Sequence, residues 1–183
     1  MTKKLAASIL CLALAFSLAG CGIFRGAAPE KTPAAPDDFS LRFSWWYDGT
    51  QKNIRDTQTG SLQTDLASDG TASAELRPEP DFLQRLYELV CKYRLTDIDR
   101  EMTSQELADD KSKAVSMIPL EHYEISVTMN GRSLLIRGDQ TAVYHMTSDE
   151  DAADFINAVT SFKKAVTELP EWTALPPANG GYD

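Results

Sequence analysis

The sequence predicts an α+β domain in which an antiparallel sheet of five to six strands carries two packed helices. Three observations lead to this prediction. The residues after position 38 alternate apolar and polar side chains, as a half-buried strand does. An Asn130-Gly131 pair separates two further alternating runs, which is the pattern of a β-hairpin. Each group of strands is followed by apolar residues at helical spacing, and this order favours helices gathered on one sheet face.

The first predicted strand contains a wholly apolar odd-numbered set: Phe39, Leu41, Phe43, Trp45 and Tyr47. A second strand is predicted over residues 52–57. A third follows Gly60, where Leu62, Thr64 and Leu66 share one face. Short turns between these runs indicate an antiparallel meander.

The first helix is predicted after Pro80, with Asp81 as its cap and Gln84 as the capping-box partner. Its apolar stripe consists of Leu83, Leu86, Tyr87 and Val90. Cys91 lies beside this stripe, and a lone cysteine on a helix face is usually a small buried hydrophobe, so we expect it to be buried. The polar connection over residues 96–118 is long enough to be functional or mobile.

The hairpin around Asn130-Gly131 is predicted to be followed by one more short strand over residues 141–146. A second helix then begins at the cap residue Ser148, with Asp151 as an acid in its first turn. Its buried stripe comprises Phe155, Ile156, Val159, Phe162 and Val166. The helix stops before Pro170, and we expect Trp172 and Leu175 to hold the C-terminal tail on the surface.

The first 20 residues have the layout of a secretory signal: a positive start at Lys3 and Lys4, then an apolar run of 15 residues from Leu5 to Ala19. A bilayer span needs about 20 apolar residues, so this run is short for a transmembrane helix. The run ends in Leu18-Ala19-Gly20-Cys21, which resembles the lipobox of bacterial lipoproteins. The alternative is an ordinary secreted protein with a chance cysteine near the cleavage site.

The lipobox resemblance implies signal cleavage between Gly20 and Cys21, a diacylglyceryl group on the Cys21 thiol, and acylation of the new amino group by a chain such as palmitate. Two or three chains anchor a protein stably, whereas one chain binds only marginally. The protein is therefore expected to be lipid-anchored in the cell membrane or the outer membrane, facing outside the cytoplasm. Residue 22 is glycine, so the aspartate that retains such proteins in the inner membrane of two-membrane hosts is missing.

Residues 21–38 are predicted to be the lipidated cysteine and a flexible tether. Pro29, Pro33 and Pro36 disfavour a helix and bias this stretch toward an extended conformation with a reach of at most about 50 Å. Residues 39–183 then form a single α+β domain. The aromatic first strand, the "DTQTGSL" turn and the "W-x-x-L-P" tail resemble a group of bacterial surface lipoproteins without an assigned activity, and this resemblance supplies no catalytic residues.

The chain is acidic, with 18 basic and 27 acidic side chains and a formal net charge of −9. Removal of residues 1–20 takes Lys3 and Lys4, so the mature charge is 16 − 27 = −11. The negative electrostatic field of such a chain repels phosphate groups, which argues against nucleic acid as a partner and against electrostatic binding to an anionic membrane. After cleavage and lipidation Cys91 is the only free thiol, so no internal disulfide can form.

Trp46 is the strongest candidate for a ligand contact. Neighbours on a strand point to opposite faces, so Trp46 should project with Arg42 and Ser44 from the face opposite Trp45. An exposed tryptophan beside arginine and serine could stack on a sugar or anchor a protein, so an envelope protein or glycan is the expected partner. The alternative is that a loop, the tail or a helix covers this face, since large aromatic residues are highly buried on average.

No metal or cofactor site is predicted. His122 and His145 each fall in a predicted strand without a zinc motif, and the acidic residues at 149–154 complement the dipole of a helix start. No catalytic motif is present in the sequence. We therefore expect a non-enzymatic binding module, and the alternative is an envelope-directed hydrolase that uses Asp and Glu side chains as acid and base.

Overall fold

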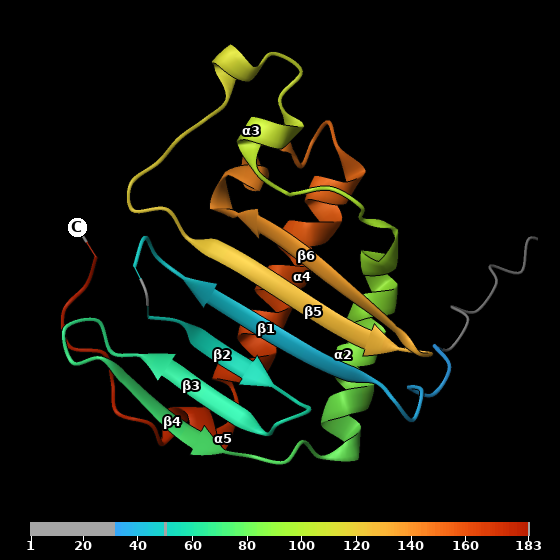
Figure 1. Cartoon of the computed structure of the whole chain (residues 1–183), viewed down its shortest axis with the longest axis vertical. Coiled ribbons are helices and arrows are strands. Elements are labelled where there is room, and N and C mark those ends of the chain that lie inside the picture. The colour runs from blue at the N-terminus through green and yellow to red at the C-terminus, as the bar shows by residue number, and fades with distance from the viewer. Residues whose placement is uncertain (1–31, 50, 183) are drawn as a thin grey trace, which may run out of the picture. The chain divides into compact units, whose positions relative to one another are not determined.

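The computed structural model describes residues 32–49 and 51–182, which form one compact unit with its own hydrophobic core. A six-stranded antiparallel sheet has the order β4-β3-β2-β1-β5-β6 (Figure 1). The strands are β1 (Ser40–Trp46), β2 (Asn53–Asp56), β3 (Ser61–Asp65), β4 (Thr71–Glu75), β5 (His122–Met129) and β6 (Arg132–Asp139). The predicted α+β class is confirmed. The signal segment 1–20, with the predicted cleavage site at Gly20 and lipidation at Cys21, lies outside the described residues.

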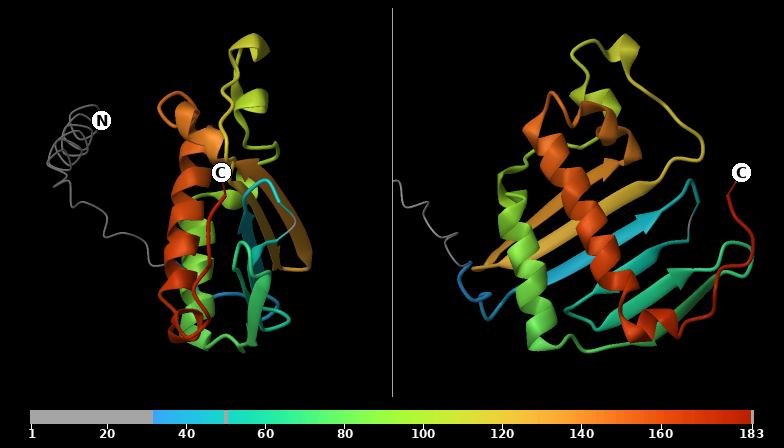
Figure 2. Two further views of the ribbon diagram at one scale, coloured as in Figure 1. Left: turned by 90° about the vertical axis from the view of Figure 1, so that its left-hand side faces the viewer. Right: turned by 180° about the vertical axis from the view of Figure 1, so that it is seen from behind.

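One face of the sheet carries the core. Helices α2 (Pro80–Lys92) and α4 (Glu150–Thr167) pack against this face, as Figure 2 shows from the side. Leu41, Phe43 and Trp45 of β1 point into it and are at most 4% exposed, as their alternation predicts. The helices contribute the apolar stripes Phe82, Leu86, Tyr87 and Val90 from α2 and Phe155, Val159, Phe162 and Val166 from α4. The result is a two-layer sandwich with one covered and one open sheet face.

Two elements differ from the sequence prediction. Residues 140–145 form a 3₁₀ helix, η3 (Gln140–His145), instead of a short strand. The cause is local: the carboxylate of Asp139 accepts the Thr141 N–H at 2.8 Å and turns the chain out of the sheet. The sixth strand is β4, whose sequence Thr-Ala-Ser-Ala-Glu has no large apolar residue to mark a buried face.

Both long helices begin differently from the prediction. The N-cap of α2 is Glu79 without a side-chain cap, and Gln84 instead accepts the Ala35 N–H and donates to the Pro33 carbonyl. The N-cap of α4 is Asp149, one residue after Ser148, and it accepts the Ala152 N–H at 3.0 Å. The predicted burial of Cys91 is wrong: the side chain is exposed, and the buried stripe of α2 ends at Val90.

The β5–β6 hairpin is confirmed, with Asn130 and Gly131 both at positive φ (52° and 71°) as a type I′ turn requires. The carboxylate of Asp38 accepts the backbone N–H of both turn residues, at 2.8 and 2.7 Å. Together with the contacts of Gln84, these bonds fix residues 33–38 to the domain. The folded unit therefore starts at Thr32, before the boundary expected at Phe39.

The long connection between η1 (Leu95–Asp97) and β5 contains α3 (Ser104–Leu107) and η2 (Lys111–Lys113). It pairs with β6 at Met102, whose N–H donates to the Arg137 carbonyl and whose carbonyl accepts the Asp139 N–H. A Cβ at Gly138 would lie 2.5 Å from the Met102 oxygen, so only glycine permits this approach. The chain ends with α5 (Pro170–Thr173) and a tail held by Trp172 and Leu175, which pack on the core as predicted.

Candidate functional site

The sheet has one face without helices packed on it, which we call the open sheet face. Its side chains come from the alternate set of each strand and are mostly polar, because the apolar set of the same strands faces the helices. Within residues 32–49 and 51–182, no helix or loop crosses in front of this face (Figures 1 and 2). The predicted face of Arg42, Ser44 and Trp46 lies at its centre, since β1 is bordered by β2 on one side and β5 on the other.

The indole of Trp46 lies between two side chains, one from the start of β2 and one from the start of β5. The Lys52 ammonium, just before β2, lies 3.6 Å from the centroid of the indole. His122 of β5, directly opposite Trp46 in the register, stacks on the indole with ring centroids 5.4 Å apart and planes 24° apart. Trp46 therefore remains half-buried, with Lys52 and His122 holding its ring.

Asp48 fixes the imidazole that supports Trp46. Its Oδ1 lies 3.0 Å from His122 Nε2, and its Oδ2 accepts the Leu120 N–H at 3.1 Å. The hydrogen bond with His122, and then that from Leu120, lowers the pKa of Asp48 below its ordinary value. The carboxylate thus stays ionised and orients the ring on which the indole rests.

Arg42 is accessible but already engaged. Its Nη1 lies 3.2 Å from Asp56 Oδ2, and the other oxygen of Asp56 accepts the N–H groups of Gln58 and Thr59 in the turn after β2. Ser44 differs from the expectation for a ligand contact, because it is only 1% exposed. The face therefore presents Trp46 and Arg42 to a ligand, while Ser44 contributes only to packing.

The sequence analysis missed Lys52, His122 and Asp48 as parts of this site. They surround Trp46 only through the register of β1 with β5 and the path of the β1–β2 turn, and neither can be read from a local pattern. A second pair of charges crosses the same face, where Arg137 Nε of β6 lies 3.1 Å from Glu124 Oε2 of β5.

Ser104 and His145 form a pair that resembles a nucleophile and its base. Ser104 Oγ lies 3.0 Å from His145 Nε2, but the serine is 1% exposed and its oxygen also accepts the Val115 N–H at 2.8 Å. A buried hydroxyl engaged in this way is not placed to attack a substrate. The pair instead ties α3, η3 and the loop at Val115 together. His145 thus lies in η3 and not in the strand predicted for it.

Glu121, Tyr123 and Lys163 form a second polar cluster, at the edge of the core. Tyr123 donates its hydroxyl to Glu121 Oε2 at 2.6 Å, and Lys163 Nζ lies 2.6 Å from Glu121 Oε1. Burial, and then the neighbouring Glu121, raises the pKa of Tyr123. These groups satisfy one another and join β5 to α4.

The acidic residues at the start of α4 are neutralised by two arginines from the α2–β5 connection. Arg94 contacts Glu150 and Asp154, and Arg100 contacts Asp149 and Asp151 at 2.7 and 3.0 Å. In the part of the chain that the structure describes, no three His, Cys, Asp or Glu side chains gather to hold a metal ion. Over the same residues, no helix is both long and apolar enough to cross a membrane.

No protein-family model matches the sequence, and no curated protein is similar to it.

Proposed function

We propose that the chain is a lipoprotein anchored outside the cytoplasm through lipid on Cys21, and that its folded unit is a non-enzymatic binding module. The partner that we propose is an envelope protein or glycan that docks on the open sheet face at Trp46. The anchor rests on the lipobox Leu18-Ala19-Gly20-Cys21 and the signal layout before it.

The observation that carries the binding proposal is the position of Trp46. It stands half-buried at the end of the central strand β1, on the uncovered face, with Lys52 and His122 against its ring. A ring that is already immobilised loses little conformational entropy when it binds, and tryptophan combines a large apolar surface with an N–H donor. Aromatic anchors of this kind carry much of the binding energy at interfaces.

Binding is tested with the full chain immobilised in detergent and exposed to envelope extract and to a panel of envelope glycans. We expect Trp46→Ala to lower the retained ligand at least tenfold and Trp46→Phe to retain part of the binding. Tyr144→Ala is the matched control, because Tyr144 is an aromatic residue that is 54% exposed on η3, away from the open face. Equal capture by folded Trp46→Ala and wild-type protein would contradict the proposal.

The anchor is tested by mass spectrometry of the N-terminal peptide from the mature protein. We expect the chain to begin at Cys21 and to carry the added mass of two or three acyl chains, and Cys21→Ser to remove the modification and the membrane attachment. A mature chain with an unmodified Cys21 would contradict the lipoprotein proposal and leave the binding proposal to be judged by Trp46.

A further inference from the structure

The outer edge of β6 has unused backbone hydrogen-bonding groups. β6 is the last strand of the sheet, and successive residues direct their N–H and C=O groups alternately toward β5 and toward the edge. The bonds from Met102 to the Arg137 carbonyl and the Asp139 N–H show which set points outward. By alternation the N–H and C=O of Ser133 and Leu135 and the N–H of Arg137 also point outward, and none of them has a backbone partner among residues 32–49 and 51–182.

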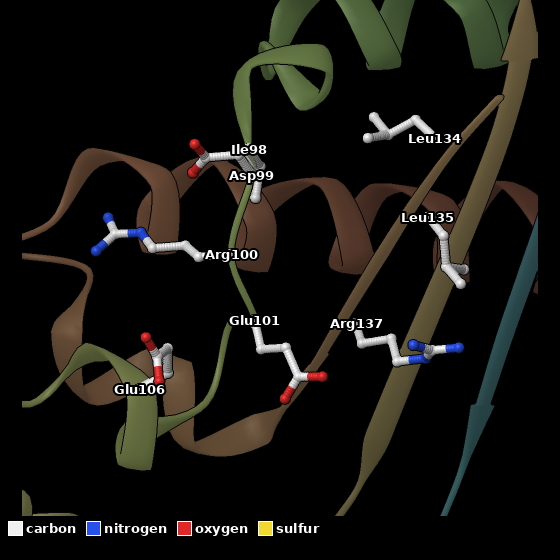
Figure 3. A pocket seen from close by; sticks show the side chains of 8 residues that line it. All are labelled: Ile98, Asp99, Arg100, Glu101, Glu106, Leu134, Leu135 and Arg137. Atoms are coloured by element: carbon white, nitrogen blue, oxygen red, sulfur yellow. The ribbon is translucent and has the colours of Figure 1, made fainter. Parts of the chain in front are cut away.

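A cavity of about 500 Å³ lies beside this edge. Before Met102 the chain separates from β6, so that residues 98–101 form one wall and Leu134, Leu135 and Arg137 form the other (Figure 3). Glu106 also lines the cavity. The walls are apolar near Ile98 and Leu134, and Leu135 is 46% exposed at the edge. Met102 already pairs with the strand in a parallel bridge, so a strand partner is accepted at this edge.

The wall opposite the strand edge favours a single chain as the occupant. Residues 98–101 line the cavity across from Leu134, Leu135 and Arg137, whereas the edge of another sheet would bring a further strand about 4.8 Å behind the one that pairs with β6. A single extended peptide has no such neighbour. It can satisfy the outward groups of Ser133, Leu135 and Arg137 by main-chain hydrogen bonds, which is the mode of β-strand addition.

The charges of the walls favour a basic peptide. Both arginines of the cavity are engaged: Arg100 contacts Asp149 and Asp151, and Arg137 contacts Glu124. Asp99 and Glu101, by contrast, have no ion-pair partner in the described part of the chain. The uncompensated charge beside the strand edge is therefore negative.

We propose that the β6 edge and the cavity between residues 98–101 and Leu134–Arg137 bind a single extended segment of a partner protein that carries lysine or arginine side chains. The segment adds a strand along Ser133–Arg137 and places its basic side chains beside Asp99 and Glu101. This surface is separate from Trp46, so the inference goes beyond the function proposed above.

The test uses the full chain in detergent and a fluorescein-labelled ten-residue peptide of alternating valine and lysine with blocked ends. We expect a saturable rise in fluorescence anisotropy and slower hydrogen exchange at the amides of Ser133, Leu135 and Arg137. A peptide with glutamate in place of lysine should bind at least tenfold more weakly. A lysine peptide N-methylated at alternate residues should not bind, because it cannot complete the main-chain bonds.

Two proline variants test the edge itself. Leu135→Pro removes an outward N–H that the β5–β6 ladder does not use, so the fold should tolerate it while peptide affinity falls at least tenfold. Ser73→Pro makes the matching change on β4, the strand at the opposite edge of the sheet. The Leu76 N–H donates to Gly60, beside β3, so by alternation the N–H of Ser73 points away from β3 and toward the edge. Ser73→Pro should leave peptide binding unchanged.

Three kinds of result would overturn the proposal. The first concerns the peptide: equal binding of the lysine peptide by wild-type protein and Leu135→Pro, or no binding by the folded wild type. The second is a concentration-dependent dimer that Leu135→Pro abolishes, which would assign the edge to a second copy. The third is protection of the Ser133 and Leu135 amides without added peptide, which would show that the chain's own segment before Thr32 occupies the edge.

Discussion

The indole of Trp45 in β1 stacks on that of Trp172 in α5, with ring centroids 5.3 Å apart and planes 28° apart. Phe43 stacks on the same Trp45 at 5.0 Å, so the contact joins the central strand to the last helix. This stack holds α5, a helix of four residues without a side-chain cap, on the sheet. The tail that follows has contacts of its own, since Asn179 exchanges backbone hydrogen bonds with Leu66 and Ser68 beside β3.

Trp172→Ala is therefore expected to lower the free energy of unfolding by about 2 kcal/mol, less than for a fully buried tryptophan because Trp172 is half-buried. Urea denaturation followed by circular dichroism measures the change. Trp172→Phe keeps an aromatic partner for Trp45 and should recover part of the loss. An alanine variant as stable as the wild type would show that the stack does not hold α5.

Gly138→Ala is expected to destabilise the fold by about 3 kcal/mol, at the upper end for overpacking. The new methyl group would lie 2.5 Å from the Met102 oxygen and 2.7 Å from the ring of Phe155, and neither backbone nor core can move away freely. Gly181→Ala is the control, since nothing lies within 4 Å of its Cβ position. Thermal unfolding of both variants checks the prediction, which fails if their melting temperatures agree.

Arg55→Met is expected to change stability by no more than about 1 kcal/mol, although Arg55 is fully buried. Its Nη1 donates to the carbonyls of Asp56 and Ser61, but within the described residues Nε and Nη2 have no partner. Methionine fills similar space and removes the unsatisfied donors together with the two bonds. Arg55→Ala leaves a cavity and should cost about 3 kcal/mol. Equal losses in the two variants, measured by urea denaturation, would contradict this reasoning.

Stability is expected to fall as the pH rises above about 10, the ordinary pKa of tyrosine. Burial raises the pKa of Tyr123 in the folded state, so the unfolded chain loses this proton first and is stabilised relative to the folded state. One such group contributes a slope of about 1.4 kcal/mol per pH unit. Urea denaturation between pH 9 and 12 should show a shallower decline for Tyr123→Phe than for the wild type. Parallel curves would exclude Tyr123 as the source.

The elements that could be predicted from sequence are those with a strong local signal. β1 alternates large apolar and polar residues. The Asn130-Gly131 pair between β5 and β6 is a turn signal that can be recognised from these two residues alone. β4 contains only small and polar residues and becomes a strand because β3 pairs with it. The strand predicted over 141–146 does not form, because a single carboxylate, Asp139, turns the backbone into a 3₁₀ helix.

The candidate site also has a part that could be predicted from local sequence and a part that could not. The side of the sheet on which Trp46 and Arg42 lie follows from strand alternation, and the structure places them together on the open face. Lys52, His122 and the cavity beside β6 depend on the register between strands and on the path of the 98–107 segment. These are long-range relationships, which no local window of the sequence contains.

The bonds of Asp38 to the Asn130-Gly131 turn have a mechanical consequence for a chain held at its N-terminus. If the proposed lipid on Cys21 holds the chain, a pull on the N-terminal side reaches the folded unit at residues 33–38, which lead directly into β1. β1 is hydrogen-bonded to β2 on one side and to β5 on the other, and Asp38 bonds to the turn between β5 and β6. Displacing this point of entry would therefore require bonds to three neighbouring segments to break.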